Sequence, residues 1–264
     1  MDYVPQFRRD ALAFEAAIRR AADAEAAPLV PSCPGWSVAD LVVHLGGVHR
    51  YVARLIRERL VEAPDHTDLS FLELPADTEG WPRPEDAPSH APLPASLIDW
   101  FTAGAVALES LFERSSPDDT VWTWSREQTT GFWVRMQSIE MAVHRWDAEN
   151  ALAAARPIDA VLAADAVAQT FEVMAPGRRV MRPAPPGAGE RFRFRQTDGA
   201  GDWTVRFEGD EVRFGESDGP GDVELAGSAS DLMLYLWQRI PADRIEVKGD
   251  REVFDRWFTL VPPV

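Results

Sequence analysis

Apolar side chains recur at intervals of three and four residues through most of the first 155 positions of the chain. This period is typical of helices that bury one face. The second predicted helix has the clearest start, because Ser37 stands at an N-cap position and Asp40 follows three residues later, as in a capping box. Four helices of this kind predict a bundle. They are expected over residues 6–27, 38–55, 95–114 and 132–155.

The stretch between the second and third predicted helices has no regular period. Six prolines lie within residues 62–93, and proline interrupts both helices and sheets. A connection of this length is typical of a crossover between elements, of a linker or of a lid over a site. The sequence leaves these possibilities open.

The period of the apolar residues changes after Arg156-Pro157. One more helix is predicted over residues 158–174, and apolar residues then alternate with polar ones, as in strands with one buried face. The chain is therefore predicted to be a two-domain α+β protein, with a four-helix bundle over residues 1–156 and a small antiparallel sheet with helices over residues 157–264. Strands are expected at 191–195, 203–207, 212–214, 223–225 and 245–248, and helices at 230–239 and 251–258.

The composition narrows the function further. The chain has 264 residues, with 27 Lys and Arg against 43 Asp and Glu, which gives a formal net charge of −16. Such a charge disfavours nucleic-acid and membrane-surface partners. The single cysteine, Cys33, excludes an internal disulfide and a Cys-based zinc finger. The N-terminal residues do not resemble a signal peptide, so we expect a cytoplasmic protein, a monomer or a small homo-oligomer.

A polar stripe on the fourth predicted helix carries the candidate chemistry. Glu140 and His144 are one turn apart and project from the same face, which is bordered by apolar residues. His44 lies on the apolar side of the second helix. Two imidazoles and one carboxylate are the ligand set of many catalytic zinc sites and also suit other divalent metals. The same residues could instead be a buried histidine satisfied by the backbone and an ordinary surface pair.

Neighbouring residues have weaker signals. Asp147, one turn beyond His144, could orient its imidazole or could pair with Arg145 or Arg50. His49 lies about 140° around the helix from His44, so it is not expected to be a ligand and could approach a cleft entrance or face solvent. Cys33 has no motif partner and is expected to be inert packing.

Two segments resemble a known family. VPSCPGWSVADLVVHL at residues 30–45 and EMAVHRWDA at residues 140–148 are similar to paired motifs of the mycothiol-dependent maleylpyruvate isomerase family. GSASDLMLYLWQR at residues 227–239 is similar to that family's C-terminal domain, which is related to sterol carrier proteins. The resemblance implies a DinB-like N-terminal bundle with a metal, usually zinc, on His44, Glu140 and His144.

The resemblance also implies a reaction class. The thiol cofactor or cosubstrate would be mycothiol, a thiol of actinobacteria. A thiol coordinated to a metal is ionised at neutral pH and can therefore act as a nucleophile. Addition of the thiolate to a conjugated double bond, rotation and loss of the thiol would make an isomerase, whereas a retained adduct would make an S-transferase. The partner would be a small electrophilic or unsaturated acid. The alternatives are a non-catalytic small-molecule-binding or regulatory module and a metal-dependent hydrolase.

An acidic substrate would need a local cation on this acidic protein, and an arginine is suited to a carboxylate. The family is thought to supply one from its C-terminal domain, which makes Arg239, at the end of the predicted helix 230–239, the candidate catalytic residue. Arg244 is a rival. The arginines that alternate along the predicted strands are expected to lie on a solvated face of the sheet.

Overall fold

The structure, a computed structural model, describes residues 1–215 and 220–263. Contacts between Cα atoms divide the chain into two compact units, the first comprising Met1–Arg156 and the second beginning at Pro157. The first unit is helical and the second contains a five-stranded sheet with helices. The predicted two-domain α+β class is confirmed.

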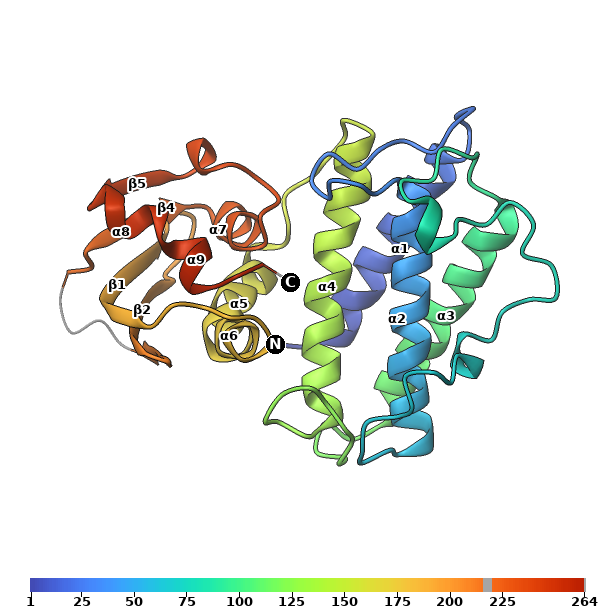
Figure 1. Cartoon of the computed structure of the whole chain (residues 1–264). Coiled ribbons are helices and arrows are strands. Elements are labelled where there is room, and N and C mark those ends of the chain that lie inside the picture. The colour runs from blue at the N-terminus through green and yellow to red at the C-terminus, as the bar shows by residue number, and fades with distance from the viewer. Residues whose placement is uncertain (216–219, 264) are drawn as a thin grey trace. The chain divides into compact units, whose positions relative to one another are not determined.

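The first unit is built from four long helices (Figure 1). They are α1 (Tyr3–Ala21), α2 (Val38–Glu58), α3 (Ala95–Arg114) and α4 (Thr130–Ala151). The α1 helix packs against α4 and α3, and α2 packs against α3 and α4. The capping box at the start of α2 is present, because the Ser37 hydroxyl accepts a hydrogen bond from the amide of Asp40 and the Asp40 carboxylate accepts one from the amide of Ser37. The predicted bounds of the third helix are confirmed.

Glycines allow α2 and α3 to approach closely. A Cβ atom added to Gly46 would lie 2.1 Å from the ring of Trp100 on α3. A Cβ atom added to Gly104 would lie 2.1 Å from Nη1 of Arg50 on α2. Among the described residues, α3 is also the one helix long and apolar enough to cross a membrane, but about half of it is covered by the other helices of the bundle.

The proline-rich connection between α2 and α3 is held against both helices. It contains two single-turn helices, η1 (Ser70–Leu72) and η2 (Pro84–Asp86). The indole nitrogen of Trp100 donates a hydrogen bond of 2.9 Å to the carbonyl of Leu72, and the ring of Trp81 packs on that of Trp100. The amide of Ser89 donates to the carboxylate of Asp40. Through these contacts the segment crosses from α2 to α3 while packing against both helices.

In the second unit, the strands form one sheet in the order β3-β2-β1-β4-β5. One pairing differs from the predicted antiparallel sheet: β1 and β4 run parallel, while the other three neighbouring pairs are antiparallel. The parallel pair arises because the chain returns to the sheet beside β1 after the β2-β3 hairpin. The strands are β1 (Gly187–Gln196), β2 (Asp202–Gly209), β3 (Glu211–Gly215), β4 (Val223–Gly227) and β5 (Glu246–Gly249).

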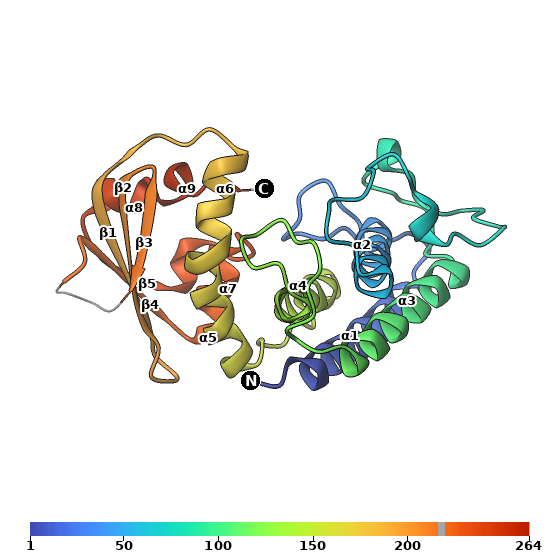
Figure 2. The ribbon, with the colours of Figure 1, turned by 90° about the horizontal axis from the view of Figure 1, so that it is seen from below.

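The helices of this unit gather on one face of the sheet (Figure 2). The predicted helix 158–174 is shorter and continues differently: α5 passes into a π-helical turn, η3, and then into α6. The predicted helix 230–239 is also shorter, because α7 ends at Leu236. The helices are α5 (Ala160–Gln169), η3 (Thr170–Met174), α6 (Ala175–Met181), α7 (Ala229–Leu236), η4 (Ala242–Arg244), α8 (Arg251–Asp255) and α9 (Trp257–Leu260).

Alternation along β1 separates the core of this unit from its solvent face. Phe192 and Phe194 are fully buried and pack on Trp257 of α9. The arginines between them point to the other face, as side chains of alternate strand residues must, and Arg193 and Arg195 form ion pairs with Glu224 there. The strand arginines on this face therefore lie in a solvated, charge-paired layer, as predicted.

Candidate metal centre

Three side chains predicted to bind a metal come together in the first unit. His44 projects from α2, and Glu140 and His144 project from successive turns of α4. Nε2 of His44 lies 3.3 Å from Oε1 of Glu140, and the ring centroids of His44 and His144 are 5.2 Å apart. One ligand atom from each residue falls within 4.8 Å of the others. A single ion between them could therefore contact all three.

The site lies at the edge of the buried core. The His44 side chain is 33% exposed and that of Glu140 is 15% exposed, whereas His144 is buried. The partial exposure of His44 leaves one side of the cluster accessible to a small molecule. The ring of Trp36 packs edge-on against the ring of His44, with 5.1 Å between the centroids, and limits the positions that the imidazole can take.

Electrostatics favour the protonation states that bind metals. Burial by itself would raise the pKa of Glu140, but the hydrogen bond and charge of His44, with smaller contributions from His144 and Gln137, lower that pKa to about 2. Burial lowers the pKa of His144. At neutral pH Glu140 is therefore an anion and His144 a neutral imidazole. These are the forms in which a carboxylate and a histidine coordinate zinc.

Asp147 holds the far side of the His144 ring. Its Oδ2 atom lies 2.9 Å from Nδ1 of His144, and its Oδ1 atom accepts a hydrogen bond of 2.6 Å from the Ser32 hydroxyl. The Cys33 thiol donates to Oδ2 at 3.4 Å. Because the carboxylate can only accept, the proton of the neutral imidazole lies on Nδ1, and the lone pair of Nε2 is directed away from Asp147.

The other candidate partners of Asp147, Arg145 and Arg50, have contacts with other residues. The guanidinium of Arg145 bonds to Asp10 at 3.1 Å and to Glu149 at 2.8 Å. Arg50 stacks over the ring of Trp100. The contact between Asp147 and the turn before α2 could not be predicted from spacing, since Ser32 and Cys33 are more than 100 residues away from it. Their only sequence signal is membership of the motif that leads into His44.

Glu140 also has a supporting partner. Nε2 of Gln137, one turn earlier on α4, donates a hydrogen bond of 2.9 Å to Oε2 of Glu140. Gln137 is itself buried, and its amide holds the carboxylate in place. The donor set fits zinc on chemical grounds: two histidines and one carboxylate, with Asp147 and Gln137 fixing the orientation of two of them.

The predicted position of His49 was wrong. Its side chain is fully buried and lies between the rings of Phe7 on α1 and Phe101 on α3, at centroid distances of 5.3 and 5.5 Å. Both ring nitrogens lack a hydrogen-bond partner among the described residues. Burial lowers the pKa of His49 to about 3. The imidazole of His49 is therefore a neutral group of the core. It is buried because α1 and α3 both pack against this side of α2.

Arg239 and Arg244 belong to the second unit. Arg239 does not close α7 but follows it, after Gln238 has entered the left-handed region at a φ of 57°. Its amide bonds back to the carbonyl of Leu234, and its Nη1 donates to the carbonyl of Trp237 at 2.8 Å. Arg244 is exposed at the end of η4.

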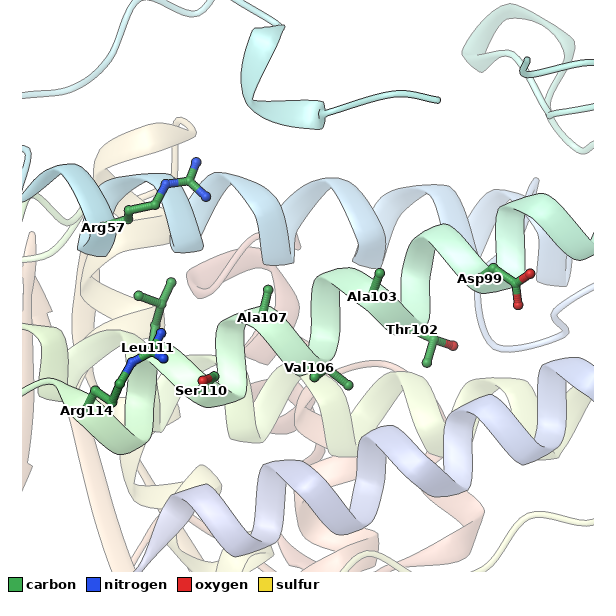
Figure 3. Close-up of a pocket in the computed structure, with 9 residues that line it drawn as sticks. All are labelled: Arg57, Asp99, Thr102, Ala103, Val106, Ala107, Ser110, Leu111 and Arg114. Atoms are coloured by element: carbon green, nitrogen blue, oxygen red, sulfur yellow. The ribbon is translucent and has the colours of Figure 1, made fainter. Parts of the chain in front are cut away.

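A surface groove of the first unit lies away from this cluster. It is a groove of about 630 Å³ along α3, lined by that helix and by Arg57 of α2 (Figure 3). Its lining includes the apolar residues Ala103, Val106 and Ala107. None of the residues of the metal cluster lines it. The groove is therefore separate from the candidate metal centre.

Two family models together match most of the chain. The family model described as the mycothiol maleylpyruvate isomerase N-terminal domain matches residues 7–149, and the model described as the MDMPI C-terminal domain matches residues 161–256. No curated protein is recognisably similar to the chain.

Two solved structures share the fold. A crystal structure of the mycothiol-dependent maleylpyruvate isomerase has a TM-score of 0.57, and that of a point mutant of this enzyme has a TM-score of 0.61. Each is 14% identical in sequence, and the match covers 94% of this chain and 93% of the other. At this identity the likeness extends to the fold of both units.

Proposed function

The chain belongs to the mycothiol maleylpyruvate isomerase family, and on that basis we propose that it is a zinc-dependent isomerase that uses mycothiol and acts on a small unsaturated acid. The observation that carries this proposal is the convergence of His44, Glu140 and His144, with one ligand atom of each within 4.8 Å of the others. Family membership alone would leave open whether the residues of a metal site are kept.

The residues of the cluster have distinct roles in this proposal. His44, Glu140 and His144 hold the zinc ion, and the exposed side of His44 leaves room for the thiol. Asp147 keeps the proton of His144 on Nδ1, so that Nε2 is available. When bound, zinc lowers the pKa of a coordinated thiol enough to ionise it at neutral pH.

Substrate binding needs a positive group, since the chain carries a net charge of −16. We assign this role to Arg239. The planar guanidinium can donate two parallel hydrogen bonds to one carboxylate, which fixes the orientation of the acid as well as its position. Arg244, which is exposed on a short helix, serves as the comparison residue for this assignment.

The test combines metal analysis with a thiol requirement. Purified protein is expected to contain about one zinc per chain, and to interconvert the cis and trans forms of an unsaturated keto acid only when mycothiol is added. Replacing Arg239 by Gln should raise the KM for the acid, while Arg244→Gln should leave it unchanged. Protein that binds no divalent metal, or that isomerises the acid equally well without thiol, would contradict the proposal.

The product distinguishes the remaining activities. A stable thioether between mycothiol and the acid would identify an S-transferase. Consumption of water without added thiol would identify a hydrolase. Binding of the acid without turnover, in protein that contains zinc and thiol, would identify a non-catalytic binding module.

A further inference from the structure

One face of α3 is exposed to solvent and carries charge only at its two ends. This α3 face consists of the residues of α3 that line the groove, and they recur every three or four positions, as residues on one side of a helix do. Between Asp99 and Arg114 all of them are uncharged. Val106, near the middle, is 60% exposed. The two glutamates of α3 lie off this face and pair with Arg8 of α1. An exposed apolar face of this kind is typical of a contact surface.

The two charges of the α3 face lie at opposite ends of the groove (Figure 3). Asp99 and Arg114 are fifteen residues apart, which is about 22 Å along the helix axis. The side chain of Asp99 is 71% exposed, and its contact with Arg19, at 3.5 Å, is an exposed pair of the kind that contributes little. Arg114 is exposed and has no carboxylate within ion-pair distance among the described residues. Both charges are therefore available to a partner.

The order of residues along the α3 face is complementary to itself. The midpoint between Asp99 and Arg114 falls between Val106 and Ala107. A two-fold axis through this midpoint, perpendicular to α3, places Asp99 opposite Arg114 of a second copy, and Arg114 opposite Asp99. The same axis places Val106 opposite Ala107 of the second copy, so that a larger side chain meets a smaller one. A contact in which each residue meets its counterpart reciprocally is the kind that a symmetric dimer requires.

We propose that the α3 face is a dimer interface, in which α3 packs antiparallel against α3 of a second copy of this chain. Ala103, Ala107 and Ser110 have short side chains, so the two helices can approach closely, and the groove of about 630 Å³ receives Val106 of the other copy. A second copy suits this face better than a nucleic acid or an anionic membrane, because both of these are repelled by a net charge of −16. The inference is independent of the proposed function, since no residue of the metal cluster lines the groove.

The mass of the protein in solution tests the interface. Sedimentation equilibrium is measured at about 0.15 M salt, where repulsion between distant charges of the two copies is screened beyond about 8 Å. A contact of one helix face is at the small end of specific interfaces, so we expect a dimer with a dissociation constant on the order of 10 μM. A wild type that stays monomeric at about 200 μM would overturn the proposal.

A substitution at the centre of the face tests where the copies meet. Val106→Glu places a carboxylate of each copy in the apolar centre of the contact, so it should raise the dissociation constant at least about tenfold. Val161→Glu, on α5, is the matched control, because Val161 is also an exposed valine on a helix, at 66%, and should leave the constant unchanged. If Val106→Glu dimerised as the wild type does, the α3 face would belong to another partner and the proposal would be wrong.

Exchange of the end charges tests the antiparallel direction. Asp99→Arg and Arg114→Asp each place like charges opposite one another at both ends of the contact, so each variant by itself should be monomeric where the wild type is dimeric. An equimolar mixture of the two variants should form a heterodimer, because the arginines of one copy then face the aspartates of the other. This heterodimer carries the same total charge as the wild-type dimer, so a difference in overall repulsion cannot explain its recovery.

The double variant Asp99→Arg with Arg114→Asp completes the test, because it should dimerise as the wild type does. Circular dichroism and the melting temperature of each variant confirm that it is folded. Arg114 has no ion-pair partner among the described residues, so Arg114→Asp and Val106→Glu keep the test decisive even if Asp99→Arg destabilises the bundle by losing its contact with Arg19. A mixture and a double variant that both fold but stay monomeric, while the wild type dimerises, would exclude the antiparallel contact.

Discussion

Nδ1 of His144 lies 2.9 Å from Oδ2 of Asp147, one turn further along α4. Asp147 is fully buried, and its other oxygen accepts a hydrogen bond from Ser32 on the turn before α2. The carboxylate thereby connects the His144 ring to the segment that leads into the helix of His44. The orientation of one candidate metal ligand thus depends on a contact between α4 and the turn that leads into α2.

The first prediction concerns this contact. Asp147→Asn keeps the shape of the side chain but removes the negative charge that holds the imidazole proton on Nδ1. The dissociation constant for zinc should rise by about 10- to 100-fold, as measured by competition with a chromophoric chelator. Ser32→Ala should have a smaller effect, because it removes one hydrogen bond to Asp147 and leaves the charge. Unchanged zinc affinity in Asp147→Asn would show that the contact does not tune the metal.

The second prediction compares two histidines of the candidate metal cluster, His44 and His144, with His49, which lies in the core. His44→Ala and His144→Ala should each abolish stoichiometric zinc binding, because three protein ligands are the minimum for a site of this type. His49→Leu should keep one zinc per chain, since its imidazole lies between Phe7 and Phe101 rather than in the cluster. The zinc content of the purified variants is the measurement. Loss of zinc in His49→Leu would place it among the ligands.

The third prediction follows from the low pKa of His49. The folded protein holds this imidazole neutral down to a pH of about 3, whereas in the unfolded chain it takes up a proton near pH 6.5. Below pH 6.5 the unfolded state therefore binds more protons, and His49 lowers the free energy of unfolding by about 1.4 kcal/mol for each pH unit of acidification.

The matching experiment compares the wild type with His49→Leu in urea between pH 7 and pH 5, in the presence of a chelator. All other titratable groups are the same in both proteins, so the difference between the two stability curves reports His49. The curve of the variant should be flatter by the amount given above. Parallel curves would mean that His49 is protonated in the folded protein.

The fourth prediction tests the packing of α2 on α3. Gly46→Ala would bring a Cβ atom to 2.1 Å from the Trp100 ring, so the indole or the helix must shift, at a cost of about 1–3 kcal/mol. Gly47→Ala is the control, because its Cβ atom would meet only Leu72, at 3.5 Å. This substitution should stabilise the protein by up to about 1 kcal/mol through helix propensity. Urea denaturation of both variants measures the difference.

Much of the fold is local information that the sequence carries by itself. The period of the apolar residues gave the four helices, including the bounds of α3, and its change after Pro157 indicated the sheet of the second unit. The pairing of Glu140 and His144 was equally accessible, because one helical turn fixes two side chains on one face. Periodicity placed His44 on the apolar side of its predicted helix and so made it a candidate third ligand, and the family motif supported that choice.

Other features depend on which elements lie against each other. His49 is buried because α1 and α3 cover a side of α2 that the apolar period did not predict to be covered. Similarly, the alternation of apolar residues along β1 and β4 did not predict that these two strands pair in parallel. The contacts of Asp147 with the turn before α2 likewise join residues with no common spacing. Periodicity determines which side of an element is apolar, while the tertiary structure decides what covers each side and therefore which polar groups lose water and need a partner.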